Sequence, residues 1–354
     1  MKPKGLHALM AMGHVVTTLL TIPSIFAFYV APTGGSVMGF AGLMAPVFVL
    51  LHGGFLMYWM TQLRAWAFLS VLVLVVMYPQ YKGVLTFHGE GNESPLWRIA
   101  SWNVHGWRNA TWTQVHSTQE GMFSCLEGAD PLLIALQEHR AELTPRLKAT
   151  WPYALEEEGG YGLAFFSKKP FGRHGFYTFS ESHPGHRGFL WADAALPAGD
   201  TIRLINVHLI TTSLVPEKYT TLSPIDSTAS HQWIKDGRDI AYRLARSGYI
   251  RARQMGEVIA FAQRSKHPVV LLGDFNDTPT SFVYGESSRL AHDAFLQAGK
   301  GFGNSYAKLA LLPLRIDHVF AQKPWIAVKY TTFKQRWSDH HPIFVDYGIE
   351  GDSL

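Results

Sequence analysis

The chain has 354 residues, of which 47% are hydrophobic and only 16% are charged, a low charged fraction for a wholly soluble protein. The imbalance is local, because no Lys, Arg, Asp or Glu occurs between Lys4 and Arg64, and the next charge is Lys82. Residues 1–81 hold 3 of the 31 basic residues and none of the 27 acidic ones, so the remainder has 28 against 27 and a net charge of +1. That balance argues against a domain that binds a long polyanion through its backbone. The single cysteine, Cys125, excludes an internal disulfide.

Three apolar runs occupy the first eighty residues, and each reaches the ~17–25 residues that a membrane-spanning helix needs. They are residues 7–30, 37–62 and 65–81. A buried core helix or a cleaved signal peptide is the alternative for any one run, and the third run is the shortest. Three successive uncharged runs with tight turns favour a membrane anchor. We therefore expect three regions: an anchor of about three transmembrane helices (1–81), a linker (82–95) and a second domain (96–354).

The few charges of the anchor predict its orientation. Lys2 and Lys4 precede the first run and Arg64 lies between the second and third. Because positive residues favour the cytoplasmic side, the amino terminus is expected inside. Three spans then place the second domain on the extracytoplasmic (periplasmic) side of an integral membrane protein.

Beyond the linker, short apolar runs of strand-like composition each end in polar residues. Polar groups at the ends of such strands converge on one rim of a sheet, where rigid elements can position a site. In chain order these residues are Asn103, Gln137-Glu138, Asn206-Val207-His208, Gly273-Asp274-Phe275-Asn276, Ile316-Asp317-His318 and Ser338-Asp339-His340.

This ordered set resembles the endonuclease/exonuclease/phosphatase superfamily, which includes DNase I-like nucleases, exonuclease III-type enzymes, neutral sphingomyelinases and inositol polyphosphate 5-phosphatases. The resemblance extends from about Trp97 to Tyr347. Each motif alone is weak, but six in the right order are specific. The resemblance implies an α+β fold, a four-layer α/β/β/α sandwich of two mixed sheets with helices outside, here preceded by the helical anchor. The arrangement is similar to that of membrane-tethered bacterial members.

Metal-assisted hydrolysis of a phosphoester needs a cation to neutralise the phosphoryl oxygens. Glu138 directly follows five apolar residues and Gln137, so a plain surface carboxylate is the weaker alternative. It is the expected hard-oxygen ligand for Mg²⁺, which keeps several waters and takes one or two carboxylates; Mn²⁺ is the alternative ion. Asn103 is expected to support the metal with its amide oxygen, and Asp339 to point toward the metal or its water shell.

The remaining roles come from the resemblance. His340 is the expected general base, since an imidazole titrates near neutral pH, and Asp317 is expected to orient it and stabilise the imidazolium. Asp274 and Asn276 would hold the attacking water and the phosphate. His208 would bind a phosphoryl oxygen or assist the leaving group; a hydrogen-bonded histidine near the sheet end is the alternative.

Three further residues and one insertion are less specific indicators of function. His318 and His341 are expected to pack or to line the rim, and Arg187 could contact phosphate. The insertion over residues 210–263 contains a segment of helical period with six basic residues against two acidic ones between Lys235 and Arg253. It is either a solvated helix or a lid or membrane-facing element suited to an anionic lipid surface.

These expectations predict an Mg²⁺-dependent phosphodiesterase that is held to the bilayer by residues 1–81. Its predicted substrate is membrane-associated: a phospholipid, sphingolipid or glycolipid-anchor headgroup. The alternative is a DNase I-like nuclease or a small-molecule phosphatase, with nucleic acid disfavoured by the near-neutral charge. A catalytically dead binding module is opposed by the presence of every expected acid, amide and histidine.

Overall fold

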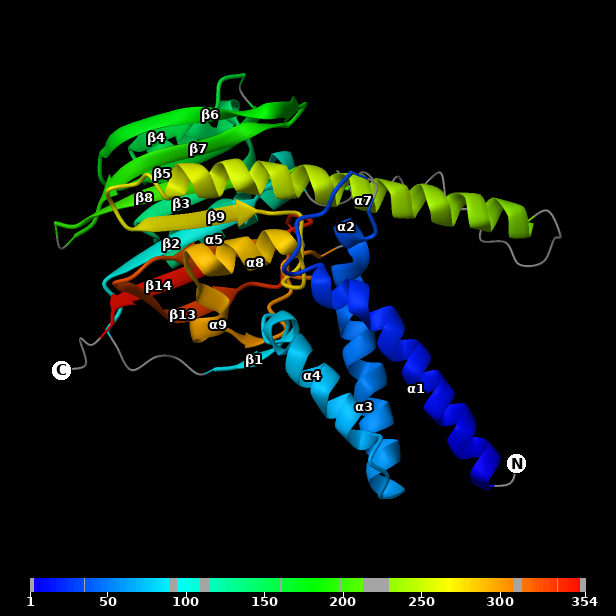
Figure 1. The fold of residues 1–354 in the computed structure, drawn as a ribbon. Coiled ribbons are helices and arrows are strands. Elements are labelled where there is room, and N and C mark those ends of the chain that lie inside the picture. The colour runs from blue at the N-terminus through cyan, green and yellow to red at the C-terminus, as the bar shows by residue number, and fades with distance from the viewer. Residues whose placement is uncertain are drawn as a thin grey trace. The chain divides into compact units, whose positions relative to one another are not determined.

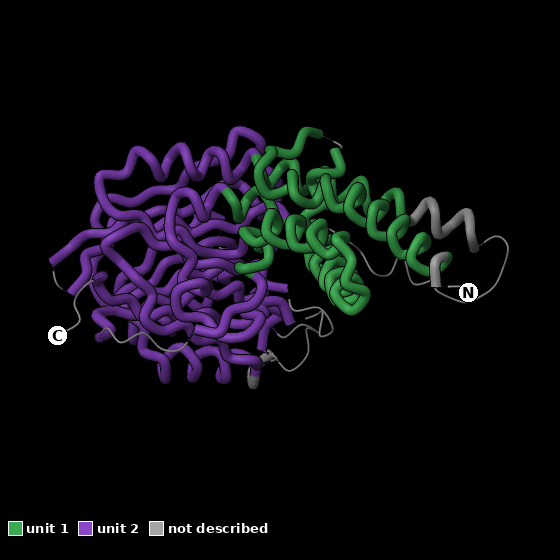
Figure 2. The backbone as a smooth tube through the Cα atoms, turned by 60° about the horizontal axis from the view of Figure 1, so that its bottom comes forward, with its two compact units in different colours: residues 1–83, 211–252, 279–285 green, residues 84–210, 253–278, 286–354 purple. Residues whose placement is uncertain are grey.

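The computed structural model describes residues 3–34, 36–88, 94–108, 115–159, 161–197, 199–212, 229–307, 314–335 and 337–350. Lys2 and residues 213–228 of the insertion lie outside them. The chain forms two compact units (Figure 2). Unit 1 comprises residues 1–83, 211–252 and 279–285, and unit 2 comprises residues 84–210, 253–278 and 286–354. The compact unit of the apolar helices thus includes two segments from much later in the chain.

Unit 2 is built on two six-stranded sheets (Figure 1). In spatial order, the first contains β10 (His292–Asp293), β12 (Asp317–Ala321), β9 (Val269–Asp274), β8 (Thr201–His208), β7 (His186–Ala195) and β6 (Phe171–His183). The second contains β13 (Trp325–Thr332), β14 (Ile343–Ile349), β2 (Trp97–Asn103), β3 (Leu133–Arg140), β5 (Tyr161–Ser167) and β4 (Tyr153–Glu156). A small pair, β1 (Thr86–Phe87) with β11 (Lys300–Gly301), lies apart from both.

The sheets are mixed, and their parallel pairs lie at the centre of each. Strands β2 and β3 run parallel, as do β8 and β9, while the other ladders are antiparallel. Strands β2 and β3 of one sheet pack on β8 and β9 of the other. The carboxyl ends of these four central strands therefore provide the positions at which side chains from both sheets can meet.

Strand β3 explains how the layers form. Its alternate residues point to opposite faces: Leu133 and Ala135 enter the core between the sheets, while Ile134 and Leu136 pack outward into a second core. That outer core includes Phe123 of α5 (Val115–Ala129). The result is helix, sheet, sheet and helix, which confirms the predicted four-layer sandwich.

The outer face of the other sheet is covered by the carboxyl-terminal part of α7 (Ala229–Ala262), whose Phe261 ring lies 5.2 Å from that of Phe189 on β7. The remaining elements are short: η2 (His105–Trp107), η3 (Ala141–Leu143), α6 (Thr144–Lys148), α8 (Phe282–Leu290) and α9 (Ala294–Ala298).

Unit 1 contains helices at all three predicted positions: α1 (Pro3–Phe26), a continuous run of α2 (Met38–Ala41), η1 (Gly42–Met44) and α3 (Ala45–Thr61), and α4 (Ala67–Tyr81). The stretches Gly5–Phe26 and Met38–Thr61 are long and apolar enough to cross a membrane, and only 17% and 22% of their apolar windows are buried. Helix α4, with 15 residues, falls short of the ~20 residues of an untilted span.

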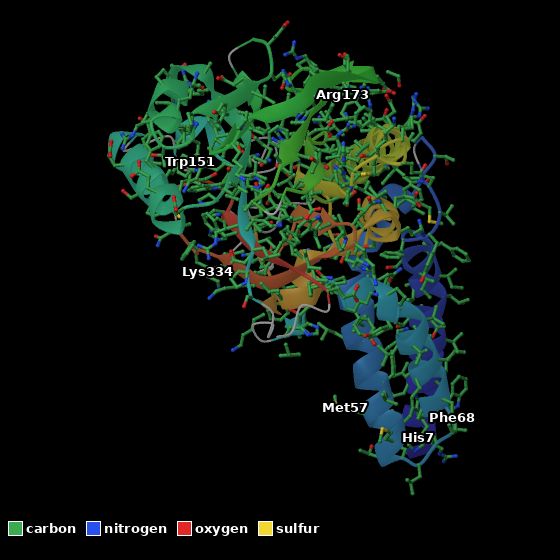
Figure 3. All side chains as sticks on the ribbon, turned by 90° about the vertical axis from the view of Figure 1, so that its left-hand side faces the viewer. His7, Met57, Phe68, Trp151, Arg173 and Lys334 are labelled. Atoms are coloured by element: carbon green, nitrogen blue, oxygen red, sulfur yellow. The ribbon has the colours of Figure 1, made fainter. Side chains whose placement is uncertain are left out.

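Large apolar side chains lie on the outside of these helices. Met57 and Phe68 are 68% and 75% exposed, and both point away from the ribbon in Figure 3. The low buried share of the apolar windows distinguishes these helices from the core helices of a soluble domain.

Polar side chains on the inner face of α1 form hydrogen bonds to α3 and α4. His7, His14 and Thr21 recur every seven residues on α1, and we call them the α1 polar seam. Their hydrogen-bond partners on α3 and α4 are Tyr58 for His7 (2.8 Å), Trp59 and Ser70 for His14 (both 3.1 Å), and His52 for Thr21 (3.2 Å). The seam aligns α1 antiparallel to α3, which places Lys4 and Arg64 at the same end of the helices.

At the opposite end, the segment 279–285 packs against the helices. A Cβ added to Gly42 of η1 would lie 2.5 Å from the Thr280 carbonyl oxygen, and one added to Gly285 would lie 2.6 Å from that of Phe28. These distances mean backbone-to-backbone contact. The later segment is therefore an integral part of this end of unit 1.

Candidate functional site

Three of the predicted site residues end central strands, and two more lie on β12 and within β3. Asn103, His208 and Asp274 are the last residues of β2, β8 and β9. Asp317 begins β12, which is antiparallel to β9 and places Asp317 directly opposite Asp274. Glu138 lies in β3, where the pairing with β5 shifts register between Leu136 and His139. Its φ of +54° is a strained conformation for a residue with a side chain, and such residues cluster at functional sites.

Asn103 joins the two sheets at this edge. Its Nδ2 donates to Asp274 Oδ2 (3.0 Å) and to Glu138 Oε1 (3.1 Å), while its Oδ1 accepts a hydrogen bond from the His105 amide (3.0 Å). The backbone donor defines which end of the amide is oxygen. In this arrangement the amide nitrogen faces the carboxylates, and the oxygen, which is the atom expected to support a metal, faces the His105 amide.

His340 and Asp317 form a buried pair. His340 Nδ1 lies 2.8 Å from Asp317 Oδ2, and its other nitrogen, Nε2, lies 3.6 Å from Asp274 Oδ2. The His340 amide donates to Ser338 Oγ (3.1 Å), which itself donates to the Asn103 carbonyl oxygen (2.8 Å). The Ser338 bridge couples the loop before β14 to the end of β2, so the imidazole is held at both ring and backbone.

The charge balance around His340 favours its protonated form. Burial alone would lower its pKa, but the carboxylates of Asp317 and Asp274 outweigh burial and raise the pKa of His340 well above its usual value. Burial raises the pKa of Asp317, and the imidazolium opposes that rise. The pair is therefore suited to holding a proton on the ring nitrogen that faces Asp317.

His208 lies on the other side of the same carboxylates. Its Nε2 is 3.6 Å from Asp274 Oδ2 and 3.9 Å from Glu138 Oε1. The ring is supported by His186, whose Nδ1 contacts the His208 carbonyl oxygen at 3.2 Å and whose ring lies 4.4 Å from that of His208. Asp274 Oδ2 is thus flanked by His208 and His340.

Asn276 is held by backbone contacts. Its amide nitrogen donates to Asp274 Oδ1 (2.8 Å), and its side-chain Nδ2 donates to the Leu209 carbonyl oxygen (2.9 Å). In this geometry Asn276 positions Asp274 and the end of β8, and one face of its amide is committed to the protein.

His105 is a site residue to which sequence reasoning assigned no role. Its Nδ1 lies 3.3 Å from Asp339 Oδ1 and 3.6 Å from Glu138 Oε2. The predicted ligands Glu138 and Asp339 are thereby brought to one imidazole nitrogen. Its position two residues after Asn103 in the same motif is the signal that could have found it.

Two further residues brace the site. Gln137 Nε2 of β3 donates to Asn206 Oδ1 of β8 (2.7 Å), which connects the two sheets. Ser305 Oγ accepts hydrogen bonds from the backbone amides of Ile316 (2.9 Å) and Asp317 (3.0 Å). These contacts position the strand ends from which the site residues project.

The other candidates lie elsewhere. His318 contacts Arg315 (3.0 Å) and the Asp277 carbonyl oxygen (2.9 Å) in a buried network. Arg187 is committed to Glu157, with a shortest contact of 2.7 Å. His341 is buried, and its backbone amide donates to the Ser305 carbonyl oxygen (2.8 Å).

Among the described residues, one group of three side chains brings potential metal ligands close together. The ligand atoms of Asp274, Asp317 and His340 lie within 4.8 Å of one another, and His340 Nδ1 is hydrogen-bonded to Asp317 Oδ2. Glu138 and Asp339, which share His105, offer carboxylates outside that pair. Carboxylate oxygens of this kind are the ligands that hard divalent cations prefer, so the donor set fits such an ion.

Comparisons with known proteins gave two family matches. The model of a family described as "Endonuclease/Exonuclease/phosphatase family" matches residues 100–340, and a model described as a domain of unknown function matches residues 7–84. No curated protein gives a significant sequence match.

Solved structures share the fold at low identity. A functionally unknown conserved protein from Enterococcus faecalis V583 is 18% identical over 72% of this chain and 100% of its own, with a TM-score of 0.52. An endonuclease/exonuclease/phosphatase from Bacteroides vulgatus is 16% identical over 72% and 99%, with a TM-score of 0.52. Another from Beutenbergia cavernae DSM 12333 is 18% identical over 73% and 72%, with a TM-score of 0.50.

Proposed function

Because the chain belongs to the endonuclease/exonuclease/phosphatase family, we propose that it is a membrane-anchored phosphodiesterase that requires a divalent cation and acts on a membrane-associated substrate. The observation that carries the proposal is the convergence, at one edge of two packed sheets, of Glu138, Asp274, His208 and the Asp317–His340 pair. This set offers a metal ligand, proton-transfer groups and a phosphate contact.

Glu138, Asn103 and Asp339 are the residues proposed to hold the cation, and the Asn103 amide nitrogen also donates to Glu138 Oε1. A bound Mg²⁺ or Mn²⁺ would neutralise charge on the phosphoryl oxygens and stabilise their further charging in the transition state.

His340 is the proposed general base. Its Nε2 faces Asp274, and a neutral ring would accept the proton of an attacking water there. Asp317, at hydrogen-bond distance from Nδ1, holds the ring's orientation and stabilises the imidazolium that results. Because nearby carboxylates raise the pKa of this ring, a bound cation must offset them before the base is neutral near pH 7.

His208 is proposed to donate to a phosphoryl oxygen or to the leaving oxygen. Its Nε2 lies beside Asp274 and Glu138, so it borders the place where the phosphate would sit. Asn276 supports the site by holding Asp274 Oδ1.

The apolar helices of unit 1 support a substrate at the membrane. Thr211, three residues after His208, and Pro279, five residues after Asp274, already belong to unit 1. The segment 279–285 packs at the end of the apolar helices remote from Arg64. Helices that span the bilayer would confine the protein to the membrane surface, where lipid headgroups are concentrated.

The proposed orientation places unit 2 outside the cytoplasm. Lys4 and Arg64 lie at one end of the helices, which is consistent with a cytoplasmic end. The later segments of unit 1 pack at the other end. Anchor residues 1–81, linker 82–95 and catalytic domain 96–354 remain our proposed division of the chain.

A panel of substrates tests the proposal. Purified full-length protein in detergent should hydrolyse a chromogenic phosphodiester only with divalent cation present, and should also cleave phospholipid, sphingolipid or glycolipid-anchor headgroups in mixed micelles. The matched control is the His340→Ala protein purified in the same way, which detects contaminating hydrolases.

The alternative functions give different results on the same panel. Strong, salt-sensitive cleavage of DNA or RNA without lipid hydrolysis would favour a nuclease. Release of phosphate from sugar phosphates alone would favour a small-molecule phosphatase. Hydrolysis that persists in excess chelator would contradict the metal assignment.

A further inference from the structure

A cavity of about 600 Å³ lies in unit 2 between the end of β13 and the segment 300–304. The described residues that line it include two lysines, Lys300 and Lys334 (labelled in Figure 3), and no aspartate or glutamate. Both lysines are exposed, and neither ammonium group has an ion pair or a hydrogen bond within the described part of the chain. The cavity therefore presents two uncompensated positive charges, which suit an anion.

The segment 300–304 adds backbone donors to this lining. Its φ angles are positive at Gly301 (+78°) and Gly303 (+59°), and a Cβ added to Gly303 would overlap the buried ring of Phe295. Within the described residues, the backbone amides of 302–304 have no hydrogen-bond partner. Successive amides in a turn of this kind form concave sites that bind anions.

The same segment continues into the candidate catalytic site. Asn304 Oδ1 accepts a hydrogen bond from the Tyr306 amide (3.2 Å), so Nδ2 remains as a donor. Tyr306 pairs with His340 in an isolated β-bridge, and their rings lie 5.2 Å apart. The Ala307 amide donates to the Asp339 carbonyl oxygen (2.8 Å). The cavity is thus a neighbour of the catalytic residues but is built from different side chains.

We propose that this cavity is a second phosphate-binding site, in which Lys300, Lys334 and the amides of 302–304 hold a phosphate group that is not hydrolysed. A phosphate accepts several charge-assisted hydrogen bonds at once. Phe302 in the lining and Phe333 beside Lys334 are 50% and 40% exposed, and exposed aromatic and basic side chains together suit an anionic lipid surface. The phosphate can be carried by a lipid headgroup or by a soluble molecule.

Lysine methyl signals test the site directly. Full-length protein in detergent is reductively methylated with ¹³C-formaldehyde, which keeps the lysine charge, and Lys300→Gln and Lys334→Gln assign the two signals. Inorganic phosphate should shift both signals saturably and leave that of Lys148, an exposed lysine on α6, in place. Equal shifts at all three lysines would indicate general charge screening, and unmoved signals of Lys300 and Lys334 would indicate no binding; either result would overturn the proposal.

Nanodiscs distinguish the two sources of the phosphate. The methylated protein is inserted into phosphatidylcholine nanodiscs with or without phosphatidic acid, in buffer free of phosphate. Shifts that require phosphatidic acid identify a lipid headgroup as the ligand. Shifts that occur only when inorganic phosphate is added identify a soluble ligand of the same site.

Affinities provide the second measurement. By calorimetry in the presence of chelator, which removes metal-dependent binding at the catalytic site, the Kd for inorganic phosphate should rise about tenfold or more in the protein with both Lys300→Gln and Lys334→Gln, the scale of a lost charge-assisted hydrogen bond. Lys148→Gln should keep the wild-type value. Circular dichroism checks that the variants fold.

An unchanged Kd in the folded double variant would assign the binding elsewhere and contradict the proposal. The site needs neither hydrolysis nor a metal, so its outcome is separate from that of the proposed function. Phosphate binding that depends on Lys300 and Lys334, in a protein that hydrolyses no substrate of the panel, would reject the proposed function and leave this inference standing.

Discussion

His340 faces carboxylates on both ring nitrogens, with Asp317 at 2.8 Å and Asp274 at 3.6 Å. Replacing His340 with Ala should lower turnover of a phosphodiester by at least ~10²-fold, the usual scale for a lost general base. Asp317→Asn should also lower turnover strongly, because the carboxylate that orients the ring and stabilises its charge is gone. Initial rates at saturating metal measure both effects.

His341 offers the matched control for that experiment. It neighbours His340 in sequence, but its backbone amide is bound to the Ser305 carbonyl oxygen, a contact that a change of side chain leaves in place. The His341→Gln protein should keep turnover near the wild-type value. Near-normal rates in His340→Ala, with the control also normal, would refute the base assignment.

A second residue-scale prediction concerns acid stability. Burial, and then the adjacent Arg315, lower the pKa of His318 to about 3. A histidine whose pKa is depressed in the folded state binds its proton mainly when the chain unfolds, so folding stability is complete above the unfolded pKa of ~6.5 and falls as pH decreases toward the folded pKa. Each such histidine removes up to about 1.4 kcal/mol per pH unit across that window.

The His318→Gln variant isolates this effect. Its unfolding free energy should decrease less steeply between about pH 6.5 and 4.5, within the window set by the two pKa values, than that of the wild-type protein, although it is less stable at neutral pH. Denaturant titrations at several pH values measure the slope. Equal slopes would show that His318 does not contribute to the acid sensitivity.

At the scale of elements, strands β8 and β9 pair closely because of Gly273. A Cβ at this position would lie 2.1 Å from the Val207 carbonyl oxygen, and φ is +133°. Gly273→Ala should reduce the unfolding free energy by about 2 kcal/mol or more, through overpacking and backbone strain. It should also lower activity, since Asp274 follows directly. Denaturant melts and diester hydrolysis measure the two effects.

Gly256 on α7 is the control glycine, because a Cβ there meets nothing within 4 Å. Gly256→Ala should leave activity unchanged and raise stability by roughly 0.5–1 kcal/mol, the helix-propensity difference. If both substitutions behaved alike, the close approach of β8 and β9 would not be the cause.

The α1 polar seam supports a prediction about the helices of unit 1. His14→Leu leaves Trp59 Nε1 and Ser70 Oγ without their contacts to the ring, and hydrogen bonds between membrane helices contribute about 0.6–1.7 kcal/mol each. The variant should unfold at lower denaturing-detergent concentration, measured by loss of helical circular dichroism. Thr18→Val should not, because the Thr18 hydroxyl donates to the His14 carbonyl oxygen of its own helix.

For the whole molecule, we expect unit 2 to lie outside the cytoplasm. A reporter that is active only outside the cytoplasm should work when fused after Leu354, and a reporter that is active only in the cytoplasm should not. Fusions after Gln62, in the connection between α3 and α4, should give the opposite pattern. Cytoplasmic activity at the carboxyl terminus would reverse the proposed orientation.

Much of the molecule was predictable because its signals are local. The buried strands β2, β3 and β9 are short apolar runs, and the polar residues that end each run are next to it in sequence. Asn103, Glu138, Asp274 and His340 could therefore be singled out before the fold was known, and the structure brings their side chains together. The apolar helices could also be predicted from the sequence, because their length and lack of charge are sufficient to identify them.

Other features depended on contacts between distant segments, which leave no periodic pattern in the chain. His105 meets Asp339 only because β2 and the loop before β14 lie side by side, and the amide of Asn103 turns its nitrogen to the carboxylates only because the backbone of His105 takes its oxygen. Residues 279–285 pack with helices more than two hundred residues earlier. The sequence by itself determined the family, the strands and the chemical types at the site; the tertiary structure decided how those groups are oriented, because orientation depends on which donors and acceptors become neighbours.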